Sequence, residues 1–198
     1  KVYDFSLDDD THWGVVEGVI AHNCGEIPLD PNNSCRLMAV NLYSFVKDPF
    51  TPYSHFSLKN FYEVSYEAMR LSDNLVDLEL EAVTRIINKI KSDPESEDLK
   101  RTELELWQKA FEAGRSSRRT GLGFTALGDA LAAMGLDYDS EDALKQVREI
   151  MYMKMTAELD CTIDMAIQRG AFDGWNPTIE KNAWYKMIKE EYPNQYER

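Results

Sequence analysis

The residues from His22 to Glu26, His-Asn-Cys-Gly-Glu, bring reactive side chains of four kinds into one short stretch. An asparagine amide can attack its own backbone carbonyl and cut the chain, if a neighbouring histidine protonates the leaving nitrogen. Cys24 then offers a thiol that can accept an acyl group. The stretch therefore suits a self-cleaving junction, whereas in a plain β-hairpin His22 and Asn23 would be ordinary turn residues.

A second chemistry begins at the same cysteine. Alternate residues of an extended chain point to one side, so Cys24 and Glu26 would face one small molecule, about 6–7 Å apart. Cys35 follows eleven residues after Cys24, behind a turn region of proline and asparagine that could fold it back toward Cys24. The alternative for such cysteines is a buried, inert structural role.

The residues before the junction resemble the C-terminal conserved blocks of an intein. An extended segment carries Asp4, His12 lies eleven residues before Asn23, and an apolar run ends in His22-Asn23. The resemblance implies that Asn23 cyclises with help from His22 and that Cys24 is the first residue of the host protein. It also implies that Asp4 and His12 support the earlier transfer steps. Splicing is then expected to need an N-terminal half, whether the intein is split or the sequence is truncated.

The residues after the junction resemble the catalytic chain of ribonucleotide reductases. Residues 24–29, 34–37 and 40–42 look like the active-site finger loop, and residues 118–129 look like the glycine-rich segment that follows in that family. The resemblance implies that Cys24 carries a thiyl radical that takes the 3′ hydrogen of the ribose, and that Glu26 accepts the 3′-hydroxyl proton. Cys35 would be one of two thiols that reduce the ribose and become a disulfide, its partner lying in a missing N-terminal half.

The finger loop is most similar to that of the adenosylcobalamin-dependent class II reductases. Class I, with a separate radical-generating metal subunit, is the alternative. The resemblance implies a ribonucleotide substrate, as diphosphate or triphosphate, a thioredoxin-like reductant and a homodimer of the full enzyme.

Two departures from the family pattern stand out. The family has an asparagine two residues before the radical cysteine, where this chain has His22, so we assign Asn23 no part in nucleotide reduction. Arg36 and Met38 stand where small or polar residues are more usual.

The composition narrows the partners and the setting. The chain has 198 residues with 35 acidic and 22 basic side chains, a formal charge of −13, which argues against direct binding of nucleic acid or an anionic membrane. No apolar run approaches the roughly 20 residues of a membrane span. Three cysteines without zinc spacing favour a reducing, cytoplasmic setting. The start at Lys1, without methionine or signal peptide, leads us to expect a fragment.

The elements that must position these residues divide the chain in two. Residues 1–23 are expected to form a short β-rich intein tail, with strands over residues 2–7 and 13–21. The resemblance to ribonucleotide reductases implies that residues 24–198 form part of a ten-stranded α/β barrel. Its finger loop would occupy residues 24–42, with a buried strand at 37–42, and a helical region would occupy residues 57–198.

Apolar spacing predicts a mostly helical α+β fragment. The first helix should end near Lys91 and bury a stripe formed by Phe61, Val64, Ala68, Leu71, Leu75 and Leu78. Further helices are predicted at residues 99–114, at 122–134 with Gly135 as the stop, from Ser140 to near Gly170, and from Asn176-Pro177 onward. The helix after Ser140 should bury Leu144, Val147, Met151, Met155 and Leu159.

Several features are predicted to be structural. The glycines at 121, 123 and 128 are expected to allow close helix packing rather than to form a phosphate loop. Cys161 is expected in the core, His55 in a structural loop, and the acidic residues 95–98 in a solvated loop.

Two further hypotheses stay open. The chain could be the C-terminal half of a split-intein precursor whose only intrinsic activity is splicing, or a helical interaction domain with coincidental motifs. On the reductase interpretation the fragment alone should have neither activity, because the intein N-part, the partner cysteine and the rest of the barrel are missing.

Overall fold

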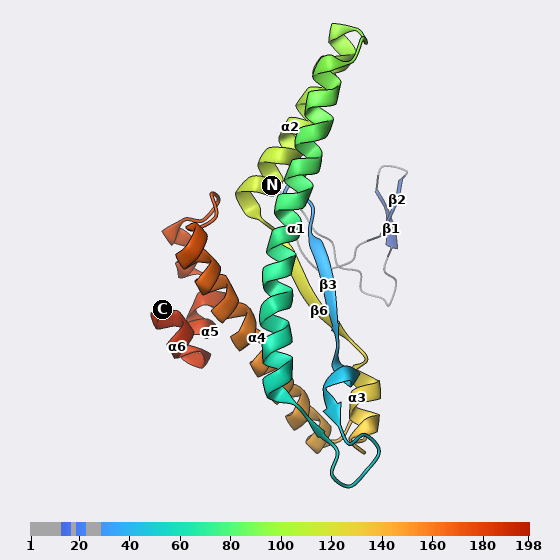
Figure 1. Cartoon of the computed structure of the whole chain (residues 1–198), viewed down its shortest axis with the longest axis vertical. Helices are drawn as coiled ribbons and strands as arrows, with labels where there is room; N and C mark the ends of the chain where they lie inside the picture. The colour runs from blue at the N-terminus through green and yellow to red at the C-terminus, as the bar shows by residue number, and fades with distance from the viewer. Residues whose placement is uncertain (1–12, 17–18, 23–28) are drawn as a thin grey trace.

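The computed structural model describes residues 13–16, 19–22 and 29–198, and it is a mostly helical α+β structure (Figure 1). The strands are β1 (Trp13–Val16), β2 (Val19–His22), β3 (Arg36–Asn41), β4 (Val46–Lys47), β5 (His55–Phe56) and β6 (Thr120–Thr125). The α-helices are α1 (Leu58–Ser92), α2 (Glu97–Ser117), α3 (Leu127–Ala133), α4 (Glu141–Arg169), α5 (Ala183–Glu191) and α6 (Pro193–Glu197). Two 3-10 helices, η1 (Leu42–Phe45) and η2 (Pro177–Lys181), complete the described elements.

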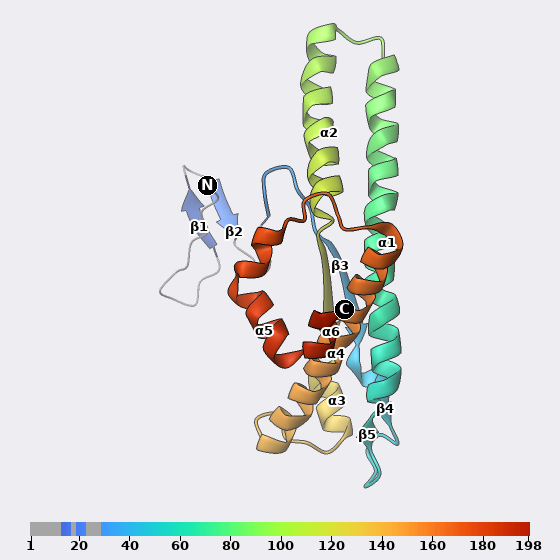
Figure 2. The same ribbon diagram turned by 90° about the vertical axis from the view of Figure 1, so that its left-hand side faces the viewer.

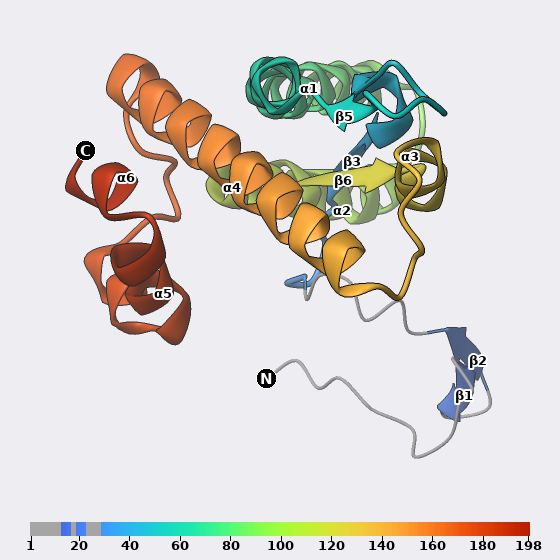
Figure 3. The ribbon, with the colours of Figure 1, turned by 90° about the horizontal axis from the view of Figure 1, so that it is seen from below.

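The long helix α1 organises the molecule. Together with α2 it forms an antiparallel pair that extends beyond the strands (Figures 1 and 2). It also packs against α4, β3 and β6, which can be followed in the view from below (Figure 3). The predicted end near Lys91 is confirmed, since Asp93 is extended (ψ 143°) as expected for a residue before proline. Of the acidic run, Glu97 and Asp98 occupy the first turn of α2, where the helix dipole favours carboxylates. The prediction of a loop was therefore wrong for these two residues.

Strands β3 and β6 form a parallel pair, with Arg36 opposite Thr120 and Asn41 opposite Thr125. Parallel strands need a long connection, and here α1 and α2 provide it. The helix predicted from residue 122 was wrong, because residues 122–125 pair with β3 and only Leu127–Ala133 is helical. Gly121 and Gly123 therefore lie in β6, a strand that packs against α1. A Cβ added at Gly128 in α3 would meet nothing within 4 Å, so the prediction of close packing was wrong for this glycine. Gly135 does follow α3 with a φ of +70°, as predicted.

The core lies where the start of α1 meets η1, α3 and the ends of β3 and β6. The rings of Phe45, Phe56 and Phe61 pack together with centroid distances of 5.2–5.9 Å. Around them the buried apolar cluster contains Val40, Leu42, Val46, Ala68, Leu122, Ala130, Ala133 and Ile150. This cluster fixes the far end of β3, and so the strand that follows Cys35.

The buried stripes of the long helices differ from those predicted. In α1, Phe61 and Ala68 are buried as expected, but Val64, Leu71 and Leu78 are 44%, 51% and 57% exposed. The buried positions instead include Ser65, Ser72 and Val76, on the side that meets the strands and α4. In α4 the buried residues are Ala143, Ile150, Ala157 and Cys161, so the core position of Cys161 is confirmed, while Leu144 is 43% exposed.

The two ends of the chain bring further corrections. Residues 13–21 were predicted as one strand, but β1 and β2 form an antiparallel pair with Trp13 opposite His22. Asn176 accepts a hydrogen bond from the Thr178 backbone N at 2.8 Å, but it begins a 3-10 helix rather than the last α-helix. Helix α5 starts after Asn182, whose side chain accepts from Tyr185 N at 3.1 Å.

The sheets of the described residues are three separate pairs, β1–β2, β3–β6 and β4–β5. The closed ten-stranded barrel therefore stays a prediction, as does the division at residue 23. The predicted strand at residues 2–7 lies outside the described residues. Among the helices described, none has the length and apolar character needed to cross a membrane.

Candidate functional site

The predicted site residues divide sharply by what the structure describes. Asp4, His12, Asn23, Cys24 and Glu26 lie outside the described residues. His22 ends β2, where its backbone pairs with Trp13. Cys35 lies within the described residues, as do Ser34 and Arg36 on either side of it, and the candidate site is built from it.

Cys35 is partly exposed and stands immediately before β3. The predicted turn before it is confirmed: Asn32 has a φ of 64°, and Asn33 N donates to the Asp30 carbonyl at 3.1 Å. The Asn33 side chain donates to Ser117 Oγ at 2.9 Å, which ties the turn to the end of α2. Cys35 therefore enters the sheet from an ordered turn, beside the start of β6.

A single carboxylate on α1 binds both neighbours of Cys35. Glu79 Oε2 accepts from Arg36 Nε at 2.6 Å, and Glu79 Oε1 accepts from Ser34 Oγ at 3.0 Å. Arg36 Nη1 also donates to the Ser34 carbonyl at 3.0 Å. The three residues form a closed hydrogen-bonded set around the backbone of Cys35.

Arg36 is well buried, with 8% of its side chain exposed against 40% for Glu79. A buried guanidinium is costly unless a carboxylate compensates its charge, and Glu79 meets that need. Its Nη2 has no hydrogen-bond partner among the described residues and lies close to Gly114 of α2. The arginine is thus held between α1 and α2.

The two departures from the family pattern both have partners on α1. Arg36 binds Glu79, while Met38 packs against the core cluster with its sulfur 4.0 Å from Ser72 Oγ. Sequence reasoning missed Glu79, which lies 43 residues after Arg36. The available signal was Arg36 itself, since a basic residue at the start of a strand predicted to be buried requires a carboxylate nearby. In the structure β3 is only partly buried, and Leu37 is 60% exposed.

A second charged cluster joins the helices behind the strands. Asp73 of α1 accepts from Arg118 Nε at 2.7 Å and from Arg169 Nη1 at 2.6 Å. The hydrogen bond to Asp73 is the main cause that raises the pKa of Arg118. Each charge has an opposite partner, so this cluster is a structural clasp. Among the described residues no group of three or more His, Cys, Asp or Glu side chains is placed to bind a metal ion.

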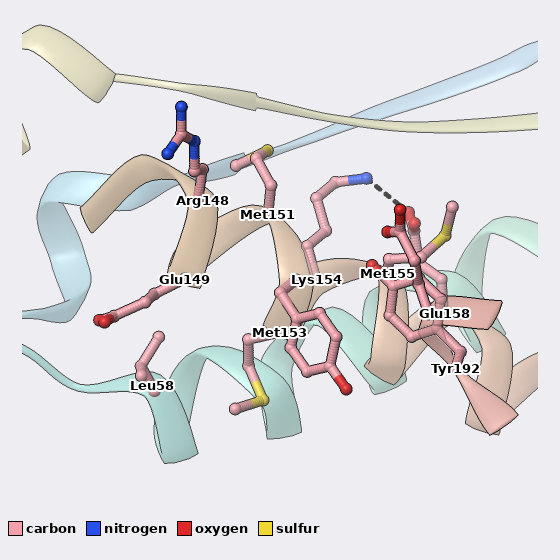
Figure 4. Close-up of a pocket in the computed structure, with 11 residues that line it drawn as sticks. Leu58, Arg148, Glu149, Met151, Met153, Lys154, Met155, Glu158 and Tyr192 are labelled. Atoms are coloured by element: carbon pink, nitrogen blue, oxygen red, sulfur yellow. Dashed lines mark hydrogen bonds and ion pairs between the residues drawn. The ribbon is translucent and has the colours of Figure 1, made fainter. Parts of the chain in front are cut away.

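An open groove of about 790 Å³ runs along α4 (Figure 4). It contains the Lys154–Glu158 ion pair at 2.7 Å and the stacked rings of Tyr152 and Tyr192. Burial is the main cause that raises the pKa of Glu158.

The groove lies far from Cys35. Leu58, at the start of α1, lines the groove. Since Glu79 lies 21 residues along the same helix, about 30 Å away, the groove is separate from Cys35. The full lining is Leu58, Arg148, Glu149, Met151, Tyr152, Met153, Lys154, Met155, Glu158, Glu191 and Tyr192.

With this geometry in place, comparison with known proteins identifies the family. A family model described as "Ribonucleotide reductase, barrel domain" matches residues 15–197. The chain belongs to this family. The match includes Cys24, Glu26 and Cys35, and also the residues from 15 to 23 that resemble an intein end, so the boundary after Asn23 stays a prediction.

Relatives of this barrel-domain chain are vitamin B12-dependent ribonucleoside-diphosphate reductases. Those of two Mycobacterium tuberculosis strains are 28% identical over 149 residues, which cover 75% of this chain and 17% of the relative. The protein of Thermoplasma acidophilum is 25% identical over 152 residues, which cover 77% of this chain and 16% of the relative. The matched region thus spans about a sixth of the length of these curated relatives.

Proposed function

We propose that this chain is a catalytic part of a vitamin B12-dependent reductase that converts ribonucleotides to deoxyribonucleotides. The observation that carries the proposal is the barrel-domain match over residues 15–197, which includes all three predicted reductase residues. The B12-dependent names of the relatives favour class II over class I. The reducing thiols of such an enzyme suit a cytoplasmic setting.

Each proposed residue has one task in the reaction. Cys24, as a thiyl radical, takes the 3′ hydrogen of the ribose and returns a hydrogen atom to the same carbon at the end, which regenerates the radical. The Glu26 carboxylate accepts the 3′-hydroxyl proton and gives it back when the hydroxyl group is restored. Replacing a hydroxyl group by hydrogen and releasing water consumes two electrons and two protons. Cys35 and a second thiol from outside these residues supply both and become a disulfide, which a thioredoxin-like reductant reopens.

Adenosylcobalamin, when bound, would supply the radical that reaches Cys24. The side chains around Cys35 do not fit a corrin ring, because Ser34, Arg36 and Glu79 are occupied with one another. We therefore derive no step through the cofactor and assign its binding to other parts of the reductase. The remaining strands of the ten-stranded barrel and the homodimer contacts are likewise proposed to come from parts of the complete enzyme outside this chain.

The reductase proposal is tested in the complete, spliced reductase that contains these residues. Cys24→Ser should abolish deoxyribonucleotide formation, and Cys35→Ser should abolish turnover with a thioredoxin-like reductant. Cys161→Ala is the matched control, because this cysteine is buried in α4 outside the proposed site. Product is measured by chromatography of labelled nucleotides. Intact nucleotide reduction in Cys24→Ser would show that the radical assignment is wrong.

A second proposed function is protein splicing at the Asn23–Cys24 bond. The eleven-residue spacing from His12 to Asn23 and the His22-Asn23-Cys24 sequence favour it. Asn23 would cut the chain after itself while Cys24 accepts the upstream host segment, with Asp4, His12 and His22 assisting. Splicing would then create the reductase, because Cys24 takes its place in the finger loop only after the tail is removed.

Mass spectrometry tests the splicing proposal after the N-terminal precursor half has been supplied. The expected product has lost residues 1–23 and carries Cys24 joined to a new host segment, and Asn23→Ala should block its formation. The same product from Asn23→Ala would contradict the proposal. An unspliced Asn23→Ala precursor that still reduced nucleotides would contradict the idea that splicing switches the enzyme on.

A further inference from the structure

We propose that Glu79 and Arg36 are positioning residues that hold the Cys35 segment in place for thiol chemistry. This inference rests on the proposed role of Cys35 as a reducing thiol, and it assigns functions to two residues that the reductase resemblance does not single out. The finger loop and α1 would then act as one unit in the reaction.

The geometry that carries the inference is the sharing of one carboxylate by both neighbours of Cys35. The two oxygens of Glu79 bind Ser34 Oγ at 3.0 Å and Arg36 Nε at 2.6 Å. Side chains on both sides of the cysteine are therefore fixed to the same point on α1. Hydrogen bonds with a charged partner are the stronger kind, and two of them that share one carboxylate restrict rotation of the intervening residue.

Glu79 lies on a helix that is held firmly by its neighbours. Helix α1 is 35 residues long and packs against α2, α4 and both strands of the parallel pair. Arg36 has little room to move, since a Cβ added at Gly114 would lie 3.1 Å from its Nη2. The backbone of Arg36 also donates to the Arg119 carbonyl at 3.3 Å. The Cys35 segment is thus held by one side chain of α1, that of Glu79, and by the backbone that leads into β6.

A fixed position matters for the Cys35 thiol, because it must react first with the ribose and then with a second cysteine. In the proposed reaction Cys35 faces the ribose and then joins a second cysteine, and each step requires the sulfur within a narrow range of positions. A displacement of about 1 Å at a reacting group can cost on the order of 100-fold in rate. Loss of the Glu79 contacts should therefore lower turnover without changing how substrate binds.

Cys161 provides an internal control for the test. It is fully buried in α4, and burial raises the pKa of its thiol to about 11, so it should react slowly while the fold is intact. The alkylation rate of Cys35 then reports how firmly its segment is held, and the alkylation rate of Cys161 reports loosening of the whole fold. Both are read in one sample by mass spectrometry of the peptides after a timed iodoacetamide pulse.

The variants are made in the complete reductase that contains these residues. Glu79→Ala should speed alkylation of Cys35 about 10-fold, as expected for the loss of charge-assisted hydrogen bonds, and leave Cys161 unchanged. Its kcat should fall on the order of 10-fold to 100-fold with the KM for nucleotide unchanged. Arg36→Met should behave like Glu79→Ala, whereas Arg36→Lys should recover most of the wild-type rate. Glu81→Gln is the matched control, because Glu81 is an exposed acid of α1 whose cationic neighbour in the same helix is Arg85.

Each outcome decides one proposal. If Cys35→Ser abolishes turnover but Glu79→Ala matches wild type in turnover and alkylation, the positioning inference is wrong while the proposed function stands. If Glu79→Ala exposes Cys161 as much as Cys35, Glu79 serves general stability and the inference is again overturned. If Cys35→Ser leaves nucleotide reduction intact, the proposed role of Cys35 as a reducing thiol is wrong, and the positioning inference that rests on it is overturned as well.

Discussion

Arg118 and Asp73 join the end of α2 to the middle of α1 through two hydrogen bonds. Arg118 donates from Nε to Asp73 Oδ1 at 2.7 Å and from Nη2 to the Asp73 carbonyl at 3.0 Å. Arg118 has a φ of 45°, a left-handed conformation that costs non-glycine residues about 1–2 kcal/mol. The bonds to Asp73 offset that cost, and Arg169 brings α4 to the same carboxylate. The start of β6, and so its register with β3, depends on this clasp.

Asp73→Asn should lower the free energy of unfolding by about 2–3 kcal/mol, because two arginines lose a buried anionic partner. Urea unfolding followed by circular dichroism measures the effect. Asp98→Asn is the matched control, since its bond to Arg101 at 3.1 Å is exposed and such pairs contribute little. Equal losses of unfolding free energy in the two variants would contradict the stabilising role of Asp73.

A Gly-to-Ala change inside a helix usually raises the free energy of unfolding by about 0.5–1 kcal/mol, and Gly114→Ala should fail to do so. The new Cβ would lie 3.1 Å from Arg36 Nη2, so the guanidinium must shift. Gly128→Ala in α3 is the control, because its Cβ would meet nothing within 4 Å and the gain should appear. Thermal unfolding of both variants tests this, and a full gain in Gly114→Ala would show that Arg36 is not held there.

Asp164→Asn should lower the pKa of Tyr66, which the native structure raises to about 12. The main cause of the raised pKa is the hydrogen bond from the Tyr66 hydroxyl to Asp164 at 2.8 Å, followed by burial. A raised folded-state pKa stabilises the protein below the unfolded value of about 10, and this stabilisation is lost as the pH rises toward 12.

Absorbance titration of tyrosinate measures this change, with Tyr66→Phe to identify the signal. Tyr62 is an internal reference, because burial and its bond to Asp160 are the main causes that raise its pKa to about 12, and the charge of Asp164 is the smallest of the causes. One tyrosine should titrate at lower pH in Asp164→Asn. An unchanged titration curve would show that the Tyr66–Asp164 bond is not formed in solution.

The elements that local sequence controls were predicted well. Pro94 ends α1, Ser140 starts α4 by accepting from Ala143 N at 3.2 Å, and Gly135 follows α3. Each of these signals acts within a few residues. The segment 122–125 has helix-like apolar spacing but is a strand, because its hydrogen-bond partners lie in β3, far away in the sequence. Local spacing cannot register such a partner.

By itself the sequence determined the family motifs, the turn before Cys35, the core position of Cys161 and the end of the long helix. These depend on residue types and on contacts between near neighbours. Only the tertiary structure decided which face of α1 is buried and that Glu79 binds both Ser34 and Arg36. Helical spacing marks several faces as apolar, and the packing of β3, β6 and α4 selects the one that is covered. The carboxylate that holds Cys35 became visible only when that packing placed α1 beside the start of β3.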